Sequence, residues 1–278
     1  MSFISFIGCG NMGKGMLTAL CNNDNINRKD IIISEPDETK LNKVTAEFGC
    51  QGVSSNIEAV KMSKYIMLCV KPQVLPDVLA GIAPTLAECI ANGEEKIILS
   101  IAAGTTIEKI QTVAGISADK LPIIRILPNL PAAIGEGLIF FSIHADNAEA
   151  PLSEIMNAFD KAGMLERIPE SQMDVAGVIG GCVPAFAYMF IEAMADGAVL
   201  CGMPRAQAIA YAAQAVKGAA GLVIANDKHP EQLKDEVCSP AGTTIEGVKA
   251  LEEHGFRNAA FSAVTKAYDK SVSLSNKK

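Results

Sequence analysis

The chain has 278 residues, of which 49% are hydrophobic, and its 24 basic and 31 acidic residues give a formal net charge of −7 at pH 7. A negative balance argues against nucleic acid or an anionic membrane as a partner, because both are bound through basic patches. The length is sufficient for two domains of ordinary size.

A glycine-rich turn follows the short apolar run that opens the chain. Gly8, Gly10 and Gly13 have the GxGxxG spacing, in which the first glycine permits a tight turn, the second lets the backbone approach a pyrophosphate, and the third lets a helix pack close to the strand. Glu35 follows the next apolar run, about 20 residues after the last glycine, where a ribose-binding carboxylate is expected. The pattern therefore favours a dinucleotide site over an ordinary strand–helix turn.

Up to about residue 165, short apolar runs alternate with helical patterns, which is typical of βαβ units and a parallel sheet. Buried strands are predicted at 3–7, 31–33, 65–70, 97–101, 123–127 and 138–141, and amphipathic helices near 37–48, 73–91 and 105–112. From about residue 171 the pattern is helical. We expect an α/β fold with a Rossmann-type doubly wound sheet domain at 1–165 and an all-α domain at 166–278.

Three loops that follow predicted strands are candidates for contacts with the cofactor. They contain Val70-Lys71-Pro72, Ala102-Ala103 and Asn129, whose amide could bond a carbonyl or amide group. Each loop alone is typical of an ordinary turn. In a parallel sheet, however, ligands lie outside the carboxyl ends of the strands, so together the loops predict the path of a nicotinamide.

The helical pattern at 205–226 is unusually rich in Ala and Gly. Alanine has high helix propensity, which is one explanation of this composition. A helix with so little side-chain volume and apolar residues on several faces is nevertheless poorly suited to solvent. We expect neighbours to enclose it, including a second subunit, so that the chain forms a homodimer.

The segment Ser239–Gly247 predicts a helix start. Thr243 and Glu246 have capping-box spacing, which indicates that a helix begins here with exposed N–H groups. This pattern either caps the helix and nothing more or, with Gly242 and the hydroxyls of Thr243 and Thr244, forms a pocket for a carboxylate. The spacing alone leaves both alternatives open.

Cysteine and histidine usage argues against metal chemistry. The 8 cysteines are scattered without a CxxC pair, and the 3 histidines have no other ligand types beside them, so we expect reduced structural cysteines and no metal. The sequence has no basic leader and no uninterrupted apolar run of about 18 residues. We expect a cytoplasmic protein that does not bind a membrane.

Motifs along nearly the whole chain resemble those of the pyrroline-5-carboxylate reductase family. They are Phe6–Gly13, Val70-Lys71-Pro72, Pro128-Asn129 with Pro131, Gly135-Glu136-Gly137, Glu192-Ala193, Ala195-Asp196-Gly197, Gly202–Arg205, His229-Pro230, Leu233-Lys234-Asp235 and Ser239–Ile245. The last of these is the most specific.

The resemblance implies reduction of 1-pyrroline-5-carboxylate to L-proline by hydride transfer from NAD(P)H, in dimers that often assemble into decamers. It implies that Gly242, Thr243 and Thr244 hold the substrate carboxylate and that Thr244 contacts the ring nitrogen. The expected cofactor-binding residues, from the motifs and the resemblance together, are Ile7, Gly8, Cys9, Gly10, Asn11, Met12, Gly13, Ser34, Glu35, Asn56, Cys69, Val70, Lys71, Pro72, Ala102, Ala103 and Asn129.

Glu35 bears on the choice of cofactor, because many family members have a small or basic residue there. A carboxylate at this position bonds a free ribose 2′-hydroxyl and repels a 2′-phosphate. We expect NADH to be preferred, with NADPH as the alternative.

Three substrate-end segments depart from the family pattern. Residues 180–186 read Gly-Gly-Cys-Val-Pro-Ala-Phe instead of Ser-Gly-Ser-Gly-Pro-Ala-Tyr, Ala241 replaces a glycine, and Leu130 replaces a threonine. The alternatives are therefore a reductase of a related cyclic imino acid and a non-catalytic NAD-binding regulatory paralogue. A β-hydroxyacid dehydrogenase is disfavoured, because that family takes a catalytic lysine from the central helix and residues 180–201 contain none.

Overall fold

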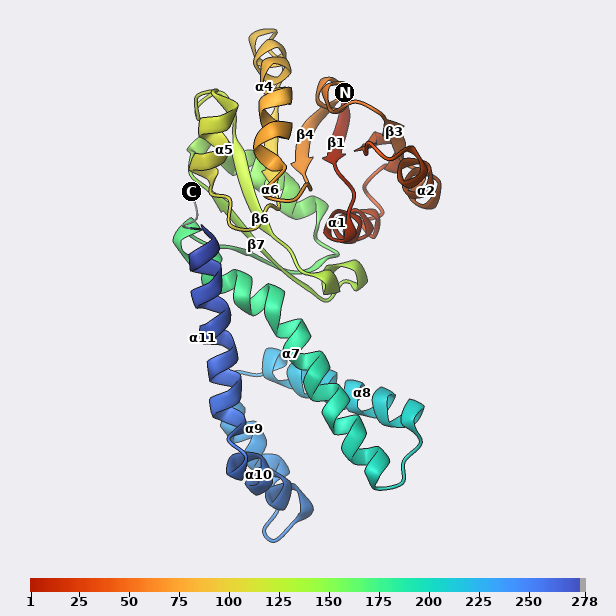
Figure 1. The fold of residues 1–278 in the computed structure, drawn as a ribbon, viewed down its shortest axis with the longest axis vertical. Coiled ribbons are helices and arrows are strands. Elements are labelled where there is room, and N and C mark those ends of the chain that lie inside the picture. Colours follow the sequence, from red (N-terminus) through yellow and green to blue (C-terminus); the bar gives the residue numbers. More distant parts are fainter. Residues whose placement is uncertain (276–278) are drawn as a thin grey trace. The chain divides into compact units, whose positions relative to one another are not determined.

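Figure 1 presents the computed structural model of the chain, which describes residues 1–275 and divides into two compact units. The first unit contains residues 1–181 and the C-terminal stretch from Lys270, and the second contains residues 182–269. The predicted domain boundary between residues 165 and 166 falls inside the last strand of the first unit.

The first unit is built on a sheet that has eight strands among the described residues, in the order β3-β2-β1-β4-β5-β6-β7-β8. The strands are β1 (Ser2–Ile7), β2 (Ile31–Ser34), β3 (Gln51–Val53), β4 (Ser63–Leu68), β5 (Ile97–Ser100), β6 (Ile123–Leu127), β7 (Gly137–Ile143) and β8 (Gly163–Arg167). All six predicted strands are present. β3 and β8 were not predicted, because both are short edge strands with mostly exposed or half-buried residues.

The sheet is parallel except at β7, which pairs antiparallel with β6. The predicted parallel pairing is confirmed from β3 to β6, and the pairing of β7 with β6 departs from it. Between β6 and β7 there is room only for η2 (Leu130–Ile134), a single short 3₁₀ helix. A parallel crossover needs about a dozen residues or more, so the short connection forces the chain to turn back.

Helices cover both faces of the sheet (Figure 1). On one face lie α1 (Asn11–Cys21), α2 (Glu38–Phe48) and α6 (Glu149–Ala158); on the other lie α3 (Asn56–Met62), α4 (Leu75–Ala91) and α5 (Ile107–Ala114). Alternate residues of β4 pack on opposite faces of the sheet. Tyr65 and Met67 lie in the core with α1, α2 and α6, and Ile66 and Leu68 lie in the core with α3, α4 and α5; all four are 0% exposed. Burial on both faces explains why the central strands read as continuous apolar runs.

Three more 3₁₀ helices, η1 (Arg28–Asp30), η3 (Asp146–Ala148) and η4 (Glu170–Gln172), complete the connections of the first unit. The remaining helices are α7 (Met173–Leu200), α8 (Arg205–Ala225), α9 (Pro230–Val237), α10 (Thr243–Glu253) and α11 (Phe256–Ser275). The two ends of this series, the start of α7 and the end of α11, belong to the first unit.

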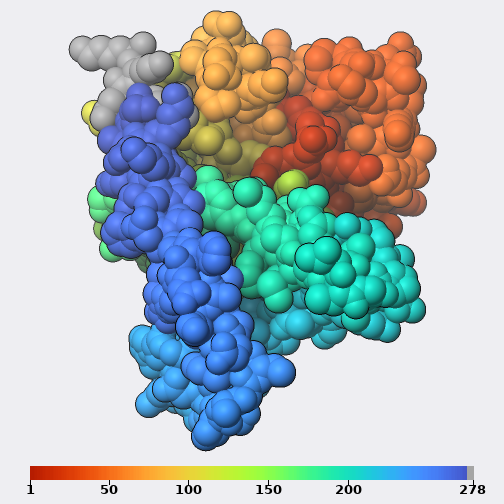
Figure 2. All heavy atoms as spheres, turned by 60° about the horizontal axis from the view of Figure 1, so that its bottom comes forward, coloured from red at the N-terminus to blue at the C-terminus, as the bar shows by residue number. Residues whose placement is uncertain are grey.

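The helices of the second unit, teal to blue in Figure 2, have little core of their own. Of the described residues in α8 only Ala208 is buried, and in α9 and α10 none is. Large apolar side chains are instead exposed, among them Tyr188, Met189, Leu200, Tyr211, Leu222, Ile224 and Phe261. Patches of this kind mark surfaces that another molecule covers.

Two segments, Glu170–Leu200 and Arg205–Ala225, are long and apolar enough to cross a membrane by length and composition alone. The sequence analysis considered uninterrupted apolar runs only, and these two helices meet a looser criterion that allows a few charged residues. A surface that binds a second subunit has the same composition.

Candidate active site

The turn from β1 to α1 has the geometry that the glycine spacing predicts. Gly8 has a φ of +84°, which side-chain-bearing residues rarely adopt. A Cβ at Gly13 would lie 3.1 Å from the Cβ of Cys69, so α1 packs directly against the chain that leaves β4. At Gly10 a Cβ would meet no described atom within 4 Å. The start of α1 is therefore open to an anion such as a pyrophosphate.

The ends of β2 and α3 meet beside this turn. Ser34, the last residue of β2, donates its hydroxyl to Oδ1 of Asn56, the first residue of α3, over 2.6 Å. The backbone N–H of Cys9 donates to Oε2 of Glu35 over 3.2 Å. Four residues predicted to bind the cofactor, from three separate parts of the chain, are thus brought together beside the glycine turn.

The two cysteines beside the turn, Cys9 and Cys69, are half-buried. Burial raises the pKa of Cys9 to about 12, and the neighbouring Cys50 and Glu35 act in the same direction. Burial also raises the pKa of Cys69 well above its usual range. Both side chains are therefore neutral at pH 7, and the turn adds no thiolate charge that would oppose a bound phosphate.

The predicted nicotinamide loops lie at the same edge of the sheet as the glycine turn. β1, β4, β5 and β6 are parallel neighbours, so their carboxyl ends share one edge. Lys71 and Pro72 are exposed after β4, while Ala102 is buried and Ala103 exposed after β5. The sheet topology thus brings these loops together, as the sequence predicted.

Asn129, after β6, is the predicted residue whose polar groups are already engaged. Its Nδ2 donates to the carbonyl oxygen of Gly180 and its Oδ1 accepts from the N–H of Leu138, each over 3.0 Å. The side chain is 7% exposed. A cofactor amide at this position would have to compete with both bonds.

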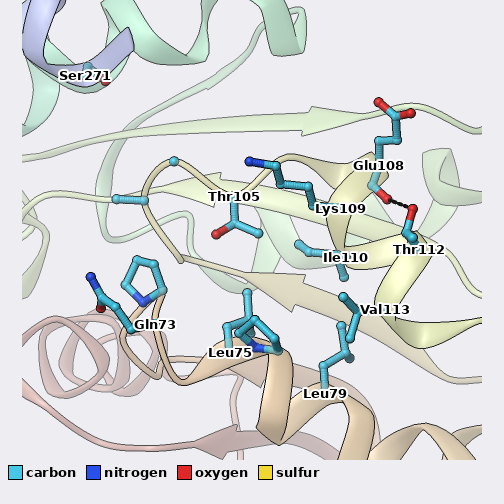
Figure 3. Close-up of a pocket in the computed structure, with 14 residues that line it drawn as sticks. Gln73, Leu75, Leu79, Thr105, Glu108, Lys109, Ile110, Thr112, Val113 and Ser271 are labelled. Atoms are coloured by element: carbon cyan, nitrogen blue, oxygen red, sulfur yellow. Dashed lines mark hydrogen bonds between the residues drawn. The ribbon is translucent and has the colours of Figure 1, made fainter. Parts of the chain in front are cut away.

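A cavity of about 920 Å³ opens between α4 and α5 (Figure 3). Its lining includes Pro72 and Ala103 from two of the predicted loops, but none of the glycine turn. Sequence reasoning missed its polar lining, which includes Gln73, Thr105 and Thr112. The signal available was their position, because all three lie in the predicted helices 73–91 and 105–112, each of which follows a predicted strand.

The start of α10 carries the predicted substrate-binding residues, and it belongs to the second unit. The helix begins at Thr243 as expected, but the capping box is wrong: the N-cap is Gly242, and no described side chain caps the helix. Thr243 is the first residue of the helix and not its N-cap, so its hydroxyl does not accept a capping hydrogen bond from the first turn. Thr243 and Thr244 are exposed, and the first N–H groups of α10 are left without a side-chain cap.

The loop before α10 is strained. Ala241 has a φ of +55° and is the one non-glycine residue with positive φ in the described part of the chain. This conformation costs about 1–2 kcal/mol for a residue with a Cβ. A glycine, which the family that the chain resembles has at this position, adopts this conformation without that cost.

Comparison with known proteins supports the same assignment of the two halves. A family model described as NADP oxidoreductase, coenzyme F420-dependent, matches residues 3–104, and one described as pyrroline-5-carboxylate reductase dimerisation matches residues 170–274. The pyrroline-5-carboxylate reductase of Escherichia coli K12 is 39% identical over 272 residues, 98% of each chain. Pyrroline-5-carboxylate reductase 3 of Rattus norvegicus is 36% identical, covering 99% of this chain and 96% of its own.

The fold also matches solved structures. The crystal structure of a Plasmodium falciparum pyrroline carboxylate reductase with NADP bound is similar with a TM-score of 0.87 and 28% identity, over 99% of this chain and 98% of the other. An imine reductase from Streptomyces aurantiacus has a TM-score of 0.56 at 14% identity, which is a likeness of fold alone.

Proposed function

Because the chain belongs to the pyrroline-5-carboxylate reductase family, we propose that it reduces 1-pyrroline-5-carboxylate to L-proline with a nicotinamide cofactor. The observation that carries this proposal is the identity of 39% over 98% of both chains. The open glycine turn and the uncapped start of α10 supply the two anion sites that such a reaction needs, one for the cofactor pyrophosphate and one for the substrate carboxylate.

The chemistry requires little of the side chains. A protonated cyclic imine is already an electrophile, so the protein has to orient it, hold its carboxylate and exclude water. When bound, the nicotinamide supplies the hydride. Gly242 and Thr243 hold the carboxylate at the start of α10, and the hydroxyl of Thr244 forms a hydrogen bond with the ring nitrogen.

For the cofactor, we propose NADH in preference to NADPH. Glu35 Oε2 accepts a hydrogen bond from the glycine turn, so its negative charge lies beside the ribose end of the site. A 2′-phosphate there would meet this charge, while a 2′-hydroxyl would donate to it. Steady-state kinetics with both cofactors tests the choice, and a kcat/KM for NADPH tenfold above that for NADH would reject it.

The chain self-associates through its helical half, and we propose a homodimer or a higher assembly such as a decamer. The exposed apolar helices of the second unit support this proposal over a membrane location. A second subunit would cover these apolar side chains, while the acidic remainder of the chain would stay in contact with water. The cytoplasmic location and the domain boundary at 165 stay predictions.

The test is imine reduction by the purified full-length chain. Incubation with pyrroline-5-carboxylate and NADH should oxidise the cofactor and form proline in equal amounts. Cofactor binding without turnover would favour the regulatory paralogue instead. Faster turnover of a six-membered cyclic imino acid would favour the related substrate, an alternative supported by the altered residues 180–183 and Ala241.

A further inference from the structure

Helix α7 contains a proline in its interior, Pro184. A proline has no backbone N–H, so it cannot donate to the carbonyl four residues earlier. In α7 that carbonyl belongs to Gly180. A buried carbonyl without a donor is costly, and the helix therefore needs a replacement from outside its own backbone.

Asn129 supplies that replacement. Its Nδ2 donates to the Gly180 oxygen over 3.0 Å, and the same side chain accepts from the N–H of Leu138 at the start of β7. One buried amide thus joins the loop after β6, the first residues of β7 and the proline-containing turn of α7.

Gly180 allows α7 to lie close to the sheet at this point. A Cβ at this residue would be 3.3 Å from Cε2 of Phe140 and 3.7 Å from the carbonyl oxygen of Leu138. The segment directly before α7 is also bonded to the first unit. Oε1 of Glu170, in η4, accepts from the N–H of Ile107 over 2.8 Å and from Arg125 over 3.1 Å. The division between the two units follows at Gly181.

We propose that Asn129 is a positioning residue for the reduction, acting through α7. By bonding the carbonyl that Pro184 leaves without a donor, it fixes the course of α7 where the helix leaves the cofactor-binding unit. This inference rests on the proposed function, which assigns the nicotinamide to the first unit and the carboxylate-binding threonines to the second. Hydride transfer needs the two held in a fixed relation, since small misplacements of reacting atoms cost large factors in rate.

A double-mutant cycle tests the proposal, because Pro184→Ala restores an N–H that can bond Gly180 within the helix. Asn129→Ala in the natural background should lower kcat about 10-fold while the KM for NADH changes less than about 2-fold. In the Pro184→Ala background the same change should cost less than about 3-fold. The bond to Leu138 is lost in both backgrounds and cancels from the comparison.

Asn147→Ala is the matched control, since this exposed asparagine also donates to backbone carbonyls, those of Ala118 and Asp119. Its effect should be the same in both backgrounds. An equal loss of kcat from Asn129→Ala in both backgrounds would overturn the proposal. So would a rise in the KM for NADH with an unchanged kcat, which would mean that Asn129 binds the cofactor directly.

Hydrogen–deuterium exchange separates this inference from the proposed function. Asn129→Ala should speed amide exchange in residues 176–183 about 10-fold, and Pro184→Ala should suppress that increase. If the exchange shows this coupling while the unaltered protein does not reduce the imine, the proposed function fails and the bond between loop and helix stands. Exchange that is unaffected by Asn129→Ala would remove the inference whatever the activity.

Discussion

At the scale of single residues, Thr244 is exposed in the first turn of a helix that no described side chain caps. Its proposed bond to the ring nitrogen is one well-placed hydrogen bond. We predict that Thr244→Ala lowers kcat about 10- to 100-fold, as measured by steady-state imine reduction.

Thr244→Ser keeps the hydroxyl and should retain most of the activity. Thr265→Ala, in α11, removes a threonine hydroxyl that bonds only its own helix among the described residues, and it should leave kcat unchanged. Equal activity of Thr244→Ala and the unaltered protein would show that the hydroxyl does not touch the reacting ring.

The proposed role of Glu35 concerns a different property, the ratio of kcat/KM for NADH to that for NADPH. Glu35→Ser removes the charge that would repel a 2′-phosphate, so we predict that this ratio falls about 10-fold or more. Glu38→Ser, an exposed change in the first turn of α2, is the control and should leave the ratio near its original value. A ratio that Glu35→Ser does not move would mean that another residue selects the cofactor.

At the scale of elements, Lys96 ties α3 to the sheet. The side chain is fully buried, its Nζ donates to the carbonyls of Val60 and Ser63 over 2.8 and 2.9 Å, and it pairs with Glu94 over 3.0 Å. Lys96→Met would leave buried carbonyls without donors. We predict a loss of about 2–4 kcal/mol in the free energy of unfolding, measured by denaturant titration.

Lys249→Met is the matched control for this prediction, because that lysine is largely exposed and its nearest carboxylate oxygen, on Glu253, is 3.9 Å away. It should leave the denaturation midpoint unchanged. If Lys96→Met were as stable as the unaltered protein, the cost of burying the ammonium group would equal the stabilisation from its hydrogen bonds. Lys96 would then not stabilise the packing of α3 on the sheet.

At the scale of the whole molecule, the second unit exposes an apolar surface that a second subunit would cover. Met189 in α7 is 70% exposed. Met189→Glu keeps a residue that favours helices but places a charge on this surface, so we predict dissociation to monomers, measured by light scattering. Since a dimer is stabilised by mass action, the melting temperature of the unaltered protein should also rise with protein concentration.

Met164→Glu provides the comparison for the dimer prediction, since Met164 is a half-exposed methionine on the edge strand β8 of the first unit. It should leave the oligomeric state unchanged. A monomer at micromolar concentration in the unaltered protein would contradict the proposed dimer.

The sequence by itself determined the two-part plan of the chain, the glycine turn and the start of α10, because these depend on local periodicity and on backbone conformations that few residues adopt. It did not determine the reversal of β7 or the edge strands, since strand direction depends on the length of the connections and edge strands lack an apolar pattern. Lys96 and Asn129 show the same limit. A lysine after two glutamates is typical of a solvated turn, and an asparagine between two prolines is typical of a loop. The tertiary structure decided that both are buried, because only there do backbone carbonyls of residues far away in the sequence come within hydrogen-bonding distance of these side chains.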